Sequence, residues 1–213
     1  MQAVDALIFD MDGTLWDAID SYCAVWNATA AYLGCRRRVA YDNLLPLMGK
    51  PLDEIYDVLI GDAYADRNGF IGLLADNEQE MMPRLGGRLY PGVKETLTEL
   101  HRRGLPLMMV SNCSQSGLDN FLDFTGLRRL ICDYLTFGGT GCDKDVNLRR
   151  LVERYKLKRP VYVGDIQRDA DSTHAAGMEF VWAAYGFGQV TDPDFKIDSF
   201  AQLLNVFDYG KQT

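Results

Sequence analysis

The stretch IFDMDGTLW, residues 8–16, ends an apolar run with two acids two positions apart, followed by Gly and Thr. An apolar run that breaks into Asp and Gly is typical of a buried strand that ends in a turn. A turn needs only one acid, and two carboxylates at a strand end repel each other unless a cation or a proton separates them. Asp10 and Asp12 are therefore the first candidates for a functional site.

Short apolar runs of this kind recur along the chain and predict buried strands. They cover residues 3–10, 105–112, 132–139, 160–165 and 179–186. Amphipathic segments lie between them, as at 91–104, where Pro91 suits a first helical turn and Gly104 a C-terminal cap. The alternation of strands and helices predicts an α/β fold, a doubly wound, Rossmann-like parallel sheet with helices on both faces.

One region interrupts this alternation. From Asp17 to about Leu85 the chain shows helical patterns such as AIDSYCAVWNATAAYLG and PLDEIYDVLIG, but no convincing strand. We therefore expect an α/β core domain of residues 1–15 and 88–213, and an inserted all-helical domain of residues 16–87.

The composition is that of a folded protein, since 47% of the 213 residues are hydrophobic. A net charge of −8 argues against nucleic acid as a partner. The five cysteines form an odd set without a C-x-x-C pair, which favours a reducing compartment. The chain shows neither a signal peptide nor a run of about 20 apolar residues. We expect a cytoplasmic protein that does not bind membranes.

Ligands of open α/β sheets bind at the carboxyl ends of the strands. Polar side chains follow the later predicted strands as well as the first. They are Ser111 and Asn112, then Lys144, then Asp165 and Asp169. Converging carboxylates without His or Cys match a hard divalent ion such as Mg²⁺, which prefers a few carboxylates together with water and phosphate.

These residue types suit phosphoryl transfer. One acid of the Asp10 and Asp12 pair can attack phosphorus, while its neighbour protonates the leaving oxygen and then deprotonates the hydrolytic water. Backbone N–H groups of the Gly13–Thr14 loop, with Ser111, Asn112 and Lys144, would hold the phosphate oxygens.

The motifs FDMDGTL at 9–15, VSN at 110–112, a downstream lysine and GDIQRDADSTHAAGM at 164–178 occur in that order. Together they resemble the four motifs of the haloacid dehalogenase superfamily, over essentially the whole chain. The resemblance implies that Asp10 is the nucleophile and a metal ligand. It implies that Asp12 is the general acid and base and offers its backbone carbonyl to Mg²⁺.

The resemblance extends to the remaining motifs. It implies that Ser111 binds phosphate with support from Asn112, that Lys144 bridges nucleophile and phosphate, that Asp165 binds the metal, and that Asp169 orients the metal shell or the lysine. Two departures are visible. The third motif usually has proline soon after its lysine, whereas Asp145 and Val146 follow Lys144; the fourth has Ile166 and Gln167 where a small hydroxyl residue is common.

The inserted segment resembles the helical C1 cap of members similar to phosphoglycolate phosphatase and β-phosphoglucomutase. Within it, MGKPLDE at 48–54 is similar to the substrate loop of such caps. Lys50 is expected either to contact the leaving group or to lie exposed in a Gly-Pro loop. The aromatic residues of the insertion, Trp26, Tyr32 and Tyr56, are expected to pack within it.

The predicted function is that of a Mg²⁺-dependent phosphatase acting on a small phosphorylated metabolite through an aspartyl-phosphate on Asp10. A phosphosugar mutase, a pyrophosphatase and a phosphonate hydrolase remain alternatives within the fold. A non-catalytic protein that binds a phosphorylated ligand is the alternative of a different class. A dehalogenase is disfavoured because Asp12 is present. Both a monomer and a homodimer remain open.

Two further features are expected to be structural. Cys113, just after the presumed phosphate site, is interpreted as a buried thiol, and the GFG at 186–188 as a loop too short for a dinucleotide fingerprint.

Overall fold

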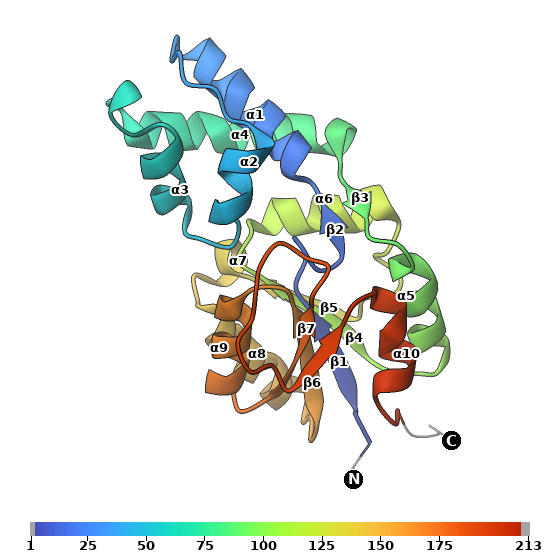
Figure 1. Ribbon diagram of the computed structural model, residues 1–213. Coiled ribbons are helices and arrows are strands. Elements are labelled where there is room, and N and C mark those ends of the chain that lie inside the picture. The colour runs from blue at the N-terminus through green and yellow to red at the C-terminus, as the bar shows by residue number, and fades with distance from the viewer. Residues whose placement is uncertain (1–2, 210–213) are drawn as a thin grey trace. The chain divides into compact units, whose positions relative to one another are not determined.

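The computed structural model of the chain describes residues 3–209. Its internal contacts divide it into two units. Unit 1 comprises the described residues up to Asp17 and from Leu89 onward, and unit 2 runs from Ala18 to Arg88. The two short strands β2 (Trp16–Asp17) and β3 (Arg88–Leu89) pair where the chain leaves unit 1 and returns to it (Figure 1).

Unit 1 is built on a six-stranded sheet with the strand order β5-β4-β1-β6-β7-β8. All its strand pairs are parallel. The strands are β1 (Ala6–Phe9), β4 (Leu107–Ser111), β5 (Asp133–Thr136), β6 (Pro160–Gly164), β7 (Glu179–Ala183) and β8 (Phe195–Ile197). The predicted parallel sheet is confirmed, and β8 is an addition to it.

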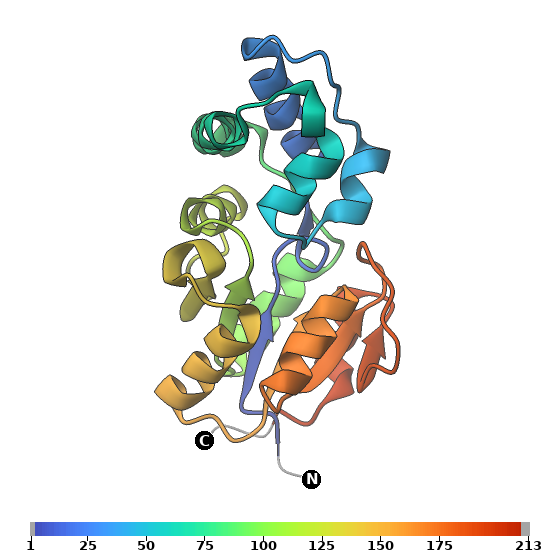
Figure 2. The ribbon, with the colours of Figure 1, turned by 90° about the vertical axis from the view of Figure 1, so that its left-hand side faces the viewer.

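Helices cover both faces of this sheet. From β1 the chain adds β4 and then β5 on one side of the sheet, and it then adds β6 and β7 on the other side of β1. Because parallel strands are joined by right-handed crossovers, the helices of these two halves lie on opposite faces of the sheet. On one side lie α5 (Val93–Arg102), α6 (Gln115–Thr125) and, after the short helix η3 (Phe200–Gln202), α10 (Leu203–Val206). On the other lie α8 (Lys144–Tyr155) and α9 (Gln167–Ala175), which stand in front of the sheet in Figure 2. The short α7 (Phe137–Thr140) follows β5.

The core follows the two-residue period of the strands. Ile8 and Tyr162 of neighbouring strands face α8 and join Leu148 and Leu151 in one buried cluster. The next residue of β1, Phe9, points to the opposite face, where its ring lies 5.7 Å from that of Phe200. Each such side chain contributes ~1.5–3 kcal/mol by leaving water.

The helix predicted over 91–104 is shorter at its start. Gly92 has φ of 82°, a left-handed conformation that a helix interior does not allow, so Pro91 precedes the helix and α5 begins at Val93. Gly104 has φ of 82° and donates its N–H to the carbonyl of His101, as expected of a C-terminal cap.

Unit 2 contains α1 (Ile19–Tyr32), α2 (Tyr41–Leu44), η1 (Leu45–Leu47), α3 (Leu52–Leu59), η2 (Gly61–Ala63) and α4 (Arg67–Leu85). The ring of Phe70 on α4 lies 5.7 Å from Trp26 and 5.2 Å from Tyr56, so these two aromatic residues pack as predicted. The prediction for Tyr32 is wrong, because its side chain is 80% exposed. The buried stripe of α1 passes through residues 19, 23, 26 and 30, and Tyr32 lies off this stripe.

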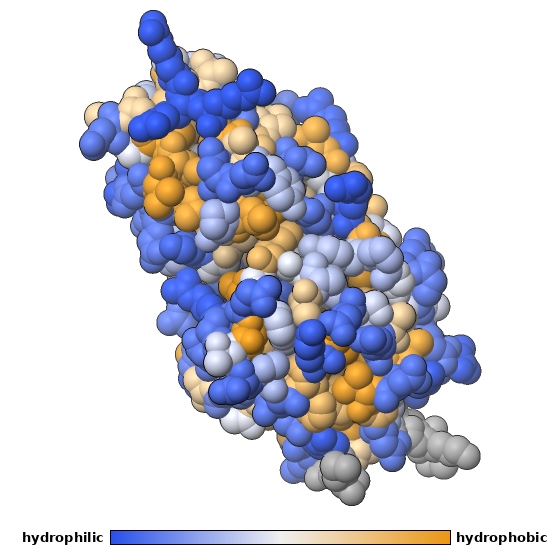
Figure 3. Space-filling model, in the orientation of Figure 1, coloured by the Kyte–Doolittle hydropathy of each residue, from blue (hydrophilic) through white to orange (hydrophobic). Residues whose placement is uncertain are grey.

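Hydrophilic side chains cover most of the face drawn in Figure 3, with apolar ones scattered among them. No helix among residues 3–209 combines the length and the apolar character needed to cross a bilayer.

Candidate active site

Three neighbouring strands bring predicted site residues to one edge of the sheet. Asp10 directly follows β1, Ser111 ends β4, and Asp165 directly follows β6. Because β1 lies between β4 and β6 and all three are parallel, their carboxyl ends meet at the same edge. All three side chains are buried. The structure therefore brings to one edge the residues predicted to be the nucleophile, the phosphate-binding hydroxyl and a metal ligand.

Three acids form a compact cluster at this edge. One carboxylate oxygen each of Asp10, Asp165 and Asp169 lie within 4.8 Å of one another, and the three side chains are buried. Asp169 belongs to the first turn of α9, where its Oδ2 accepts the N–H of Asp165 at 3.1 Å and that of Ile166 at 3.3 Å. Asp169 therefore fixes the turn that carries Asp165.

Lys144 supplies a positive charge to this cluster. It is the first residue of α8 and only 4% exposed. Its Nζ lies 3.1 Å from Oδ1 of Asp10 and 2.5 Å from Oδ1 of Asp169. The same atom lies 5.4 Å from the ring centre of Tyr162, a residue that the sequence did not single out. The lysine predicted from the order of the motifs therefore lies beside both acids.

The cluster carries more negative than positive charge. Burial raises the pKa of Asp10 to about 6, although Lys144 opposes this shift. Burial, with the charges of Asp169 and Asp10, also raises the pKa of Asp165 well above its usual range. Burial disfavours the charge of Lys144, but the carboxylates of Asp10 and Asp169 outweigh it and hold its pKa above the ordinary value. Such a site favours an additional cation.

The loop after β1 closes against Asp165. Gly13 has φ of 77°, and a Cβ atom there would come within 2.0 Å of Oδ2 of Asp165, so only glycine fits. Thr14 donates its hydroxyl to Oδ1 of Asp165 at 3.3 Å. Asp12 accepts the indole N–H of Trp16 at 2.9 Å, which orients its carboxylate.

The loop after β7 (Glu179–Ala183) also contacts Asp165, a contact that was not predicted. Phe187 donates its backbone N–H to Oδ2 of Asp165 at 2.8 Å, and Tyr185 donates its hydroxyl to the carbonyl of Thr14, also at 2.8 Å. At Gly186 a Cβ atom would come within 2.4 Å of the Gly13 carbonyl oxygen. GFG at 186–188 is a loop as predicted, but it also packs against the site. Two glycines just after a strand were the available signal.

The remaining candidates differ in their exposure. Asn112 and Cys113 follow Ser111 in the loop after β4 and are half-buried. The interpretation of Cys113 as a buried thiol is therefore wrong, because the residue lies beyond the strand. Lys50 lies exposed in unit 2, between η1 and α3. The site geometry described above is entirely that of unit 1.

The protein is thus an α/β protein with a parallel sheet whose edge holds a buried acid cluster and one lysine. A family model described as haloacid dehalogenase-like hydrolase matches residues 7–183. The protein therefore belongs to the haloacid dehalogenase-like hydrolases, which confirms the family predicted from its motifs.

Curated relatives cover nearly the whole chain. The phosphoglycolate phosphatase of Vibrio vulnificus strain CMCP6 is 29% identical over an alignment of 228 positions, gaps included, which covers 96% of both proteins. That of Synechococcus elongatus is 29% identical over an alignment of 219 positions, gaps included, which covers 94% of this chain and 96% of the relative. A solved structure described as a predicted phosphoglycolate phosphatase from Haemophilus somnus has a TM-score of 0.85 and 24% identity, and covers 97% of this chain and 99% of its own. This last likeness supports the fold.

Proposed function

We propose that the protein is a Mg²⁺-dependent phosphatase that hydrolyses a small phosphorylated metabolite through an aspartyl-phosphate on Asp10. The observation that carries this proposal is the Lys144 ammonium paired with both Asp10 and Asp169, beside the third acid Asp165. This cluster combines a nucleophile, a fixed cation and spare carboxylate oxygens. The names of the relatives from Vibrio and Synechococcus support phosphoglycolate as the first substrate to test.

The acid cluster fits a hard divalent cation. Its donors are oxygen atoms only, which suits Mg²⁺. Asp169 is already engaged by Lys144 and by two backbone N–H groups. Asp10 and Asp165, with the backbone carbonyl of Asp12, are therefore the proposed ligands. When bound, Mg²⁺ would supply positive charge that balances the carboxylates and the phosphate oxygens.

The first half of the reaction uses the two acids after β1. A carboxylate oxygen of Asp10 attacks phosphorus, and the bond to the leaving oxygen breaks as Asp12 transfers its proton to that oxygen. Lys144 and Ser111 hold the phosphate oxygens. The Trp16 indole keeps the Asp12 carboxyl in place.

In the second half the roles of Asp12 reverse. Its carboxylate takes a proton from water, whose oxygen attacks the phosphorus of the aspartyl-phosphate and releases inorganic phosphate. Asp10 returns as a carboxylate and Asp12 as an acid. Spacing by two residues separates the attacking group from the proton carrier.

We further propose that the helical insertion of residues 16–87 is the cap domain of this enzyme and that Lys50 contacts the leaving group. Lys50→Met should raise KM for phosphoglycolate several-fold and leave KM for p-nitrophenyl phosphate unchanged. Lys94→Met, an exposed lysine on α5, is the matched control and should change neither value. Equal KM values for phosphoglycolate in both variants would refute the role of Lys50.

The test of the main proposal is phosphate release from a panel of phosphorylated metabolites, with and without Mg²⁺. Asp10→Asn should abolish turnover. Asp171→Asn, an exposed acid on α9 that accepts from Gln167, should leave it unchanged. A folded, Mg²⁺-loaded wild type that releases phosphate from no substrate would overturn the proposal that the protein is a phosphatase. It would favour a mutase that needs a phosphodonor, or a non-catalytic binding protein.

A further inference from the structure

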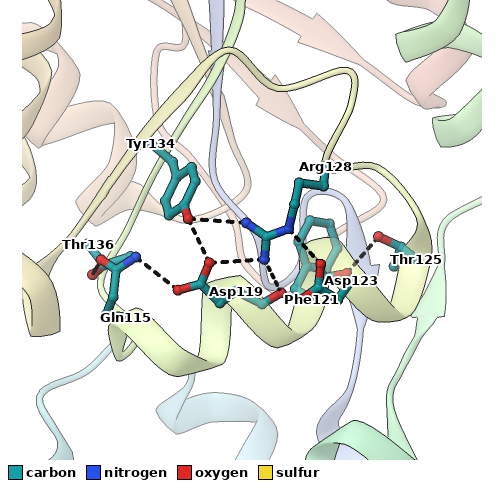
Figure 4. A network of polar contacts seen from close by, with 8 residues as sticks. All are labelled: Gln115, Asp119, Phe121, Asp123, Thr125, Arg128, Tyr134 and Thr136. Atoms are coloured by element: carbon teal, nitrogen blue, oxygen red, sulfur yellow. Dashed lines mark hydrogen bonds and ion pairs between the residues drawn. The ribbon is translucent and has the colours of Figure 1, made fainter.

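A chain of polar contacts links α6 to β5 next to the candidate site (Figure 4). Oδ1 of Asp119 accepts the hydroxyl of Tyr134 at 2.6 Å and an N–H of Arg128 at 3.0 Å. Its Oδ2 accepts the side-chain amide of Gln115 at 3.1 Å. Gln115, in the first turn of α6, is therefore oriented from its own helix, and its amide oxygen points toward Thr136.

Thr136 ends this chain of contacts inside the protein. Its side chain is completely buried, and its hydroxyl donates to Oε1 of Gln115 at 3.2 Å. The oxygen of the Thr136 hydroxyl also accepts the backbone N–H of Gly139 at 2.9 Å, so Thr136 is the N-terminal cap of α7. One hydroxyl thus serves two partners, one in the first turn of α6 and one in α7.

These partners lie on the two segments next to the proposed phosphate-binding groups, residues 112–115 after Ser111 and residues 137–143 before Lys144, which form the two loops of this site. Thr136 is the register partner of Ser111, because β4 and β5 pair in parallel. The loop after Ser111 leads to Gln115, and the loop after Thr136 leads to Lys144. Between them, Gly138 donates its N–H to the carbonyl of Cys113 at 3.2 Å.

The two loops are packed backbone to backbone. A Cβ atom at Gly138 would come within 2.7 Å of Cα of Ser114, and one at Gly139 within 2.4 Å of Oε1 of Gln115. Glycine is thus required at Gly138 for the two backbones to approach so closely, whereas at Gly139 the contact is with the end of the Gln115 side chain. A shift of one loop would be transmitted directly to the other.

We propose that Thr136 is a positioning residue that holds Ser111 and Lys144 at a fixed spacing, so that both reach one phosphate group. This inference rests on the proposed phosphatase function. Without the hydroxyl, the Gly139 N–H and the Gln115 amide oxygen lose their shared partner, and the hydrogen bond from Gly138 to the Cys113 carbonyl remains as a tie between the two loops. Small displacements of positioning groups are costly in phosphoryl transfer because catalysis depends on placement.

The test compares Thr136→Val, which keeps the side-chain shape without the hydroxyl, with Thr136→Ser, which restores the hydroxyl. In Thr136→Val, we expect KM for p-nitrophenyl phosphate and the inhibition constant of inorganic phosphate each to rise about 3- to 10-fold, as for one lost hydrogen bond. We expect kcat to change less than KM. Thr136→Ser should return both constants to within about twofold of wild type.

Thr125→Val is the matched control, because Thr125 lies at the other end of α6 and donates its hydroxyl to the Phe121 carbonyl at 2.6 Å (Figure 4). It should leave both constants unchanged. If Thr136→Val does not fold, Gln115→Met replaces an exposed residue and should shift both constants in the same direction. Unchanged constants in a folded Thr136→Val, or equal changes in Thr125→Val, would overturn the proposal.

A readout without turnover separates this inference from the proposed function. If wild type hydrolyses no substrate but inorganic phosphate raises its melting temperature, the phosphate concentration needed should be higher for Thr136→Val than for wild type. An equal concentration would overturn the role of Thr136. A wild type that neither turns over substrate nor responds to phosphate would overturn both proposals.

Discussion

The ammonium group of Lys144 lies 2.5 Å from Oδ1 of Asp169, whose other carboxylate oxygen accepts the N–H groups of the turn after β6. One buried side chain therefore holds both the lysine and the turn that carries Asp165. Lys144 and Asp165 therefore depend on the same acid for their positions.

Replacing this acid should affect stability and activity together. Asp169→Asn removes one of the two carboxylates beside Lys144, and breaking a buried ion pair costs ~3–5 kcal/mol of unfolding free energy. Because supporting groups tune such sites, we expect kcat to fall ~10–100-fold. Urea unfolding and steady-state phosphate release measure the two effects. Wild-type values for both would show that Lys144 is held by Asp10 alone.

The Gly13 position predicts a specific loss of metal affinity. Gly13→Ala adds a Cβ atom within 2.0 Å of Oδ2 of Asp165 and strains a backbone with φ of 77°. Gly177→Ala imposes the same strain at φ of 74° without a contact within 4 Å. Both variants should lose ~1 kcal/mol of unfolding free energy. Only Gly13→Ala should need at least about tenfold more Mg²⁺ for half-maximal activity. Equal Mg²⁺ requirements would contradict the proposed role of Asp165.

The pKa of Asp10 predicts how the metal-free protein responds to pH. Burial raises this pKa to about 6 from an ordinary 3.8. A group whose pKa is raised in the folded state gives its full stabilisation below its unfolded pKa and loses it as pH rises through the folded pKa. Asp10→Asn cannot ionise at this position.

In the presence of a chelator, the unfolding free energy of the wild type minus that of Asp10→Asn should therefore fall as the pH rises from about 4 to 7. Denaturant titrations at several pH values in a chelator measure this difference. Added Mg²⁺ should reduce the fall, because the cation compensates the carboxylate charge. A difference that is flat, or that grows with pH, would contradict the burial of an ionised Asp10.

Asn147 lies just after Lys144, in the region where the chain lacks the proline that is usual in the third motif. Its side chain is 1% exposed and donates to the carbonyl of Cys142 at 3.0 Å, which ties α8 to the loop just before Lys144. Asn147→Ala frees that loop, and we expect kcat to fall about 3- to 10-fold, the factor of one hydrogen bond. Arg150→Ala, exposed on the same helix, is the control. Equal kcat values in the two variants would show that the loop needs no such tie.

The strands of the core were predictable because their apolar runs are short and bounded by turn residues. All five predicted strands are present, and alternation with helices correctly indicated parallel pairing. The strand β8 was missed because it is only the three residues FKI, with the exposed Lys196 at its centre. An edge strand that short has no recognisable period.

The convergence at the site was predictable where a charged side chain directly follows a strand, as for Asp10 and Asp165, whereas Lys144 was found from the order of the motifs. Their convergence follows from parallel topology alone. The loop of Phe187 contributes a backbone N–H, which any residue type supplies, so nothing in its side chain marked it. Thr136 acts through its register with Ser111, and register is a property of the folded sheet. The catalytic roles themselves stay predictions until the variants are measured.

The central place of β1 has a consequence for the order in which the chain is made. This strand is synthesised before both of its partners, β4 and β6, and β6 ends only at Gly164. At ~5–20 residues per second, the ribosome needs roughly 8 to 31 s to supply the second partner. Unit 2 is one continuous stretch that is complete at residue 88. During that interval the apolar residues of β1 lack one of their two strand partners, and chaperones would have an opportunity to bind them.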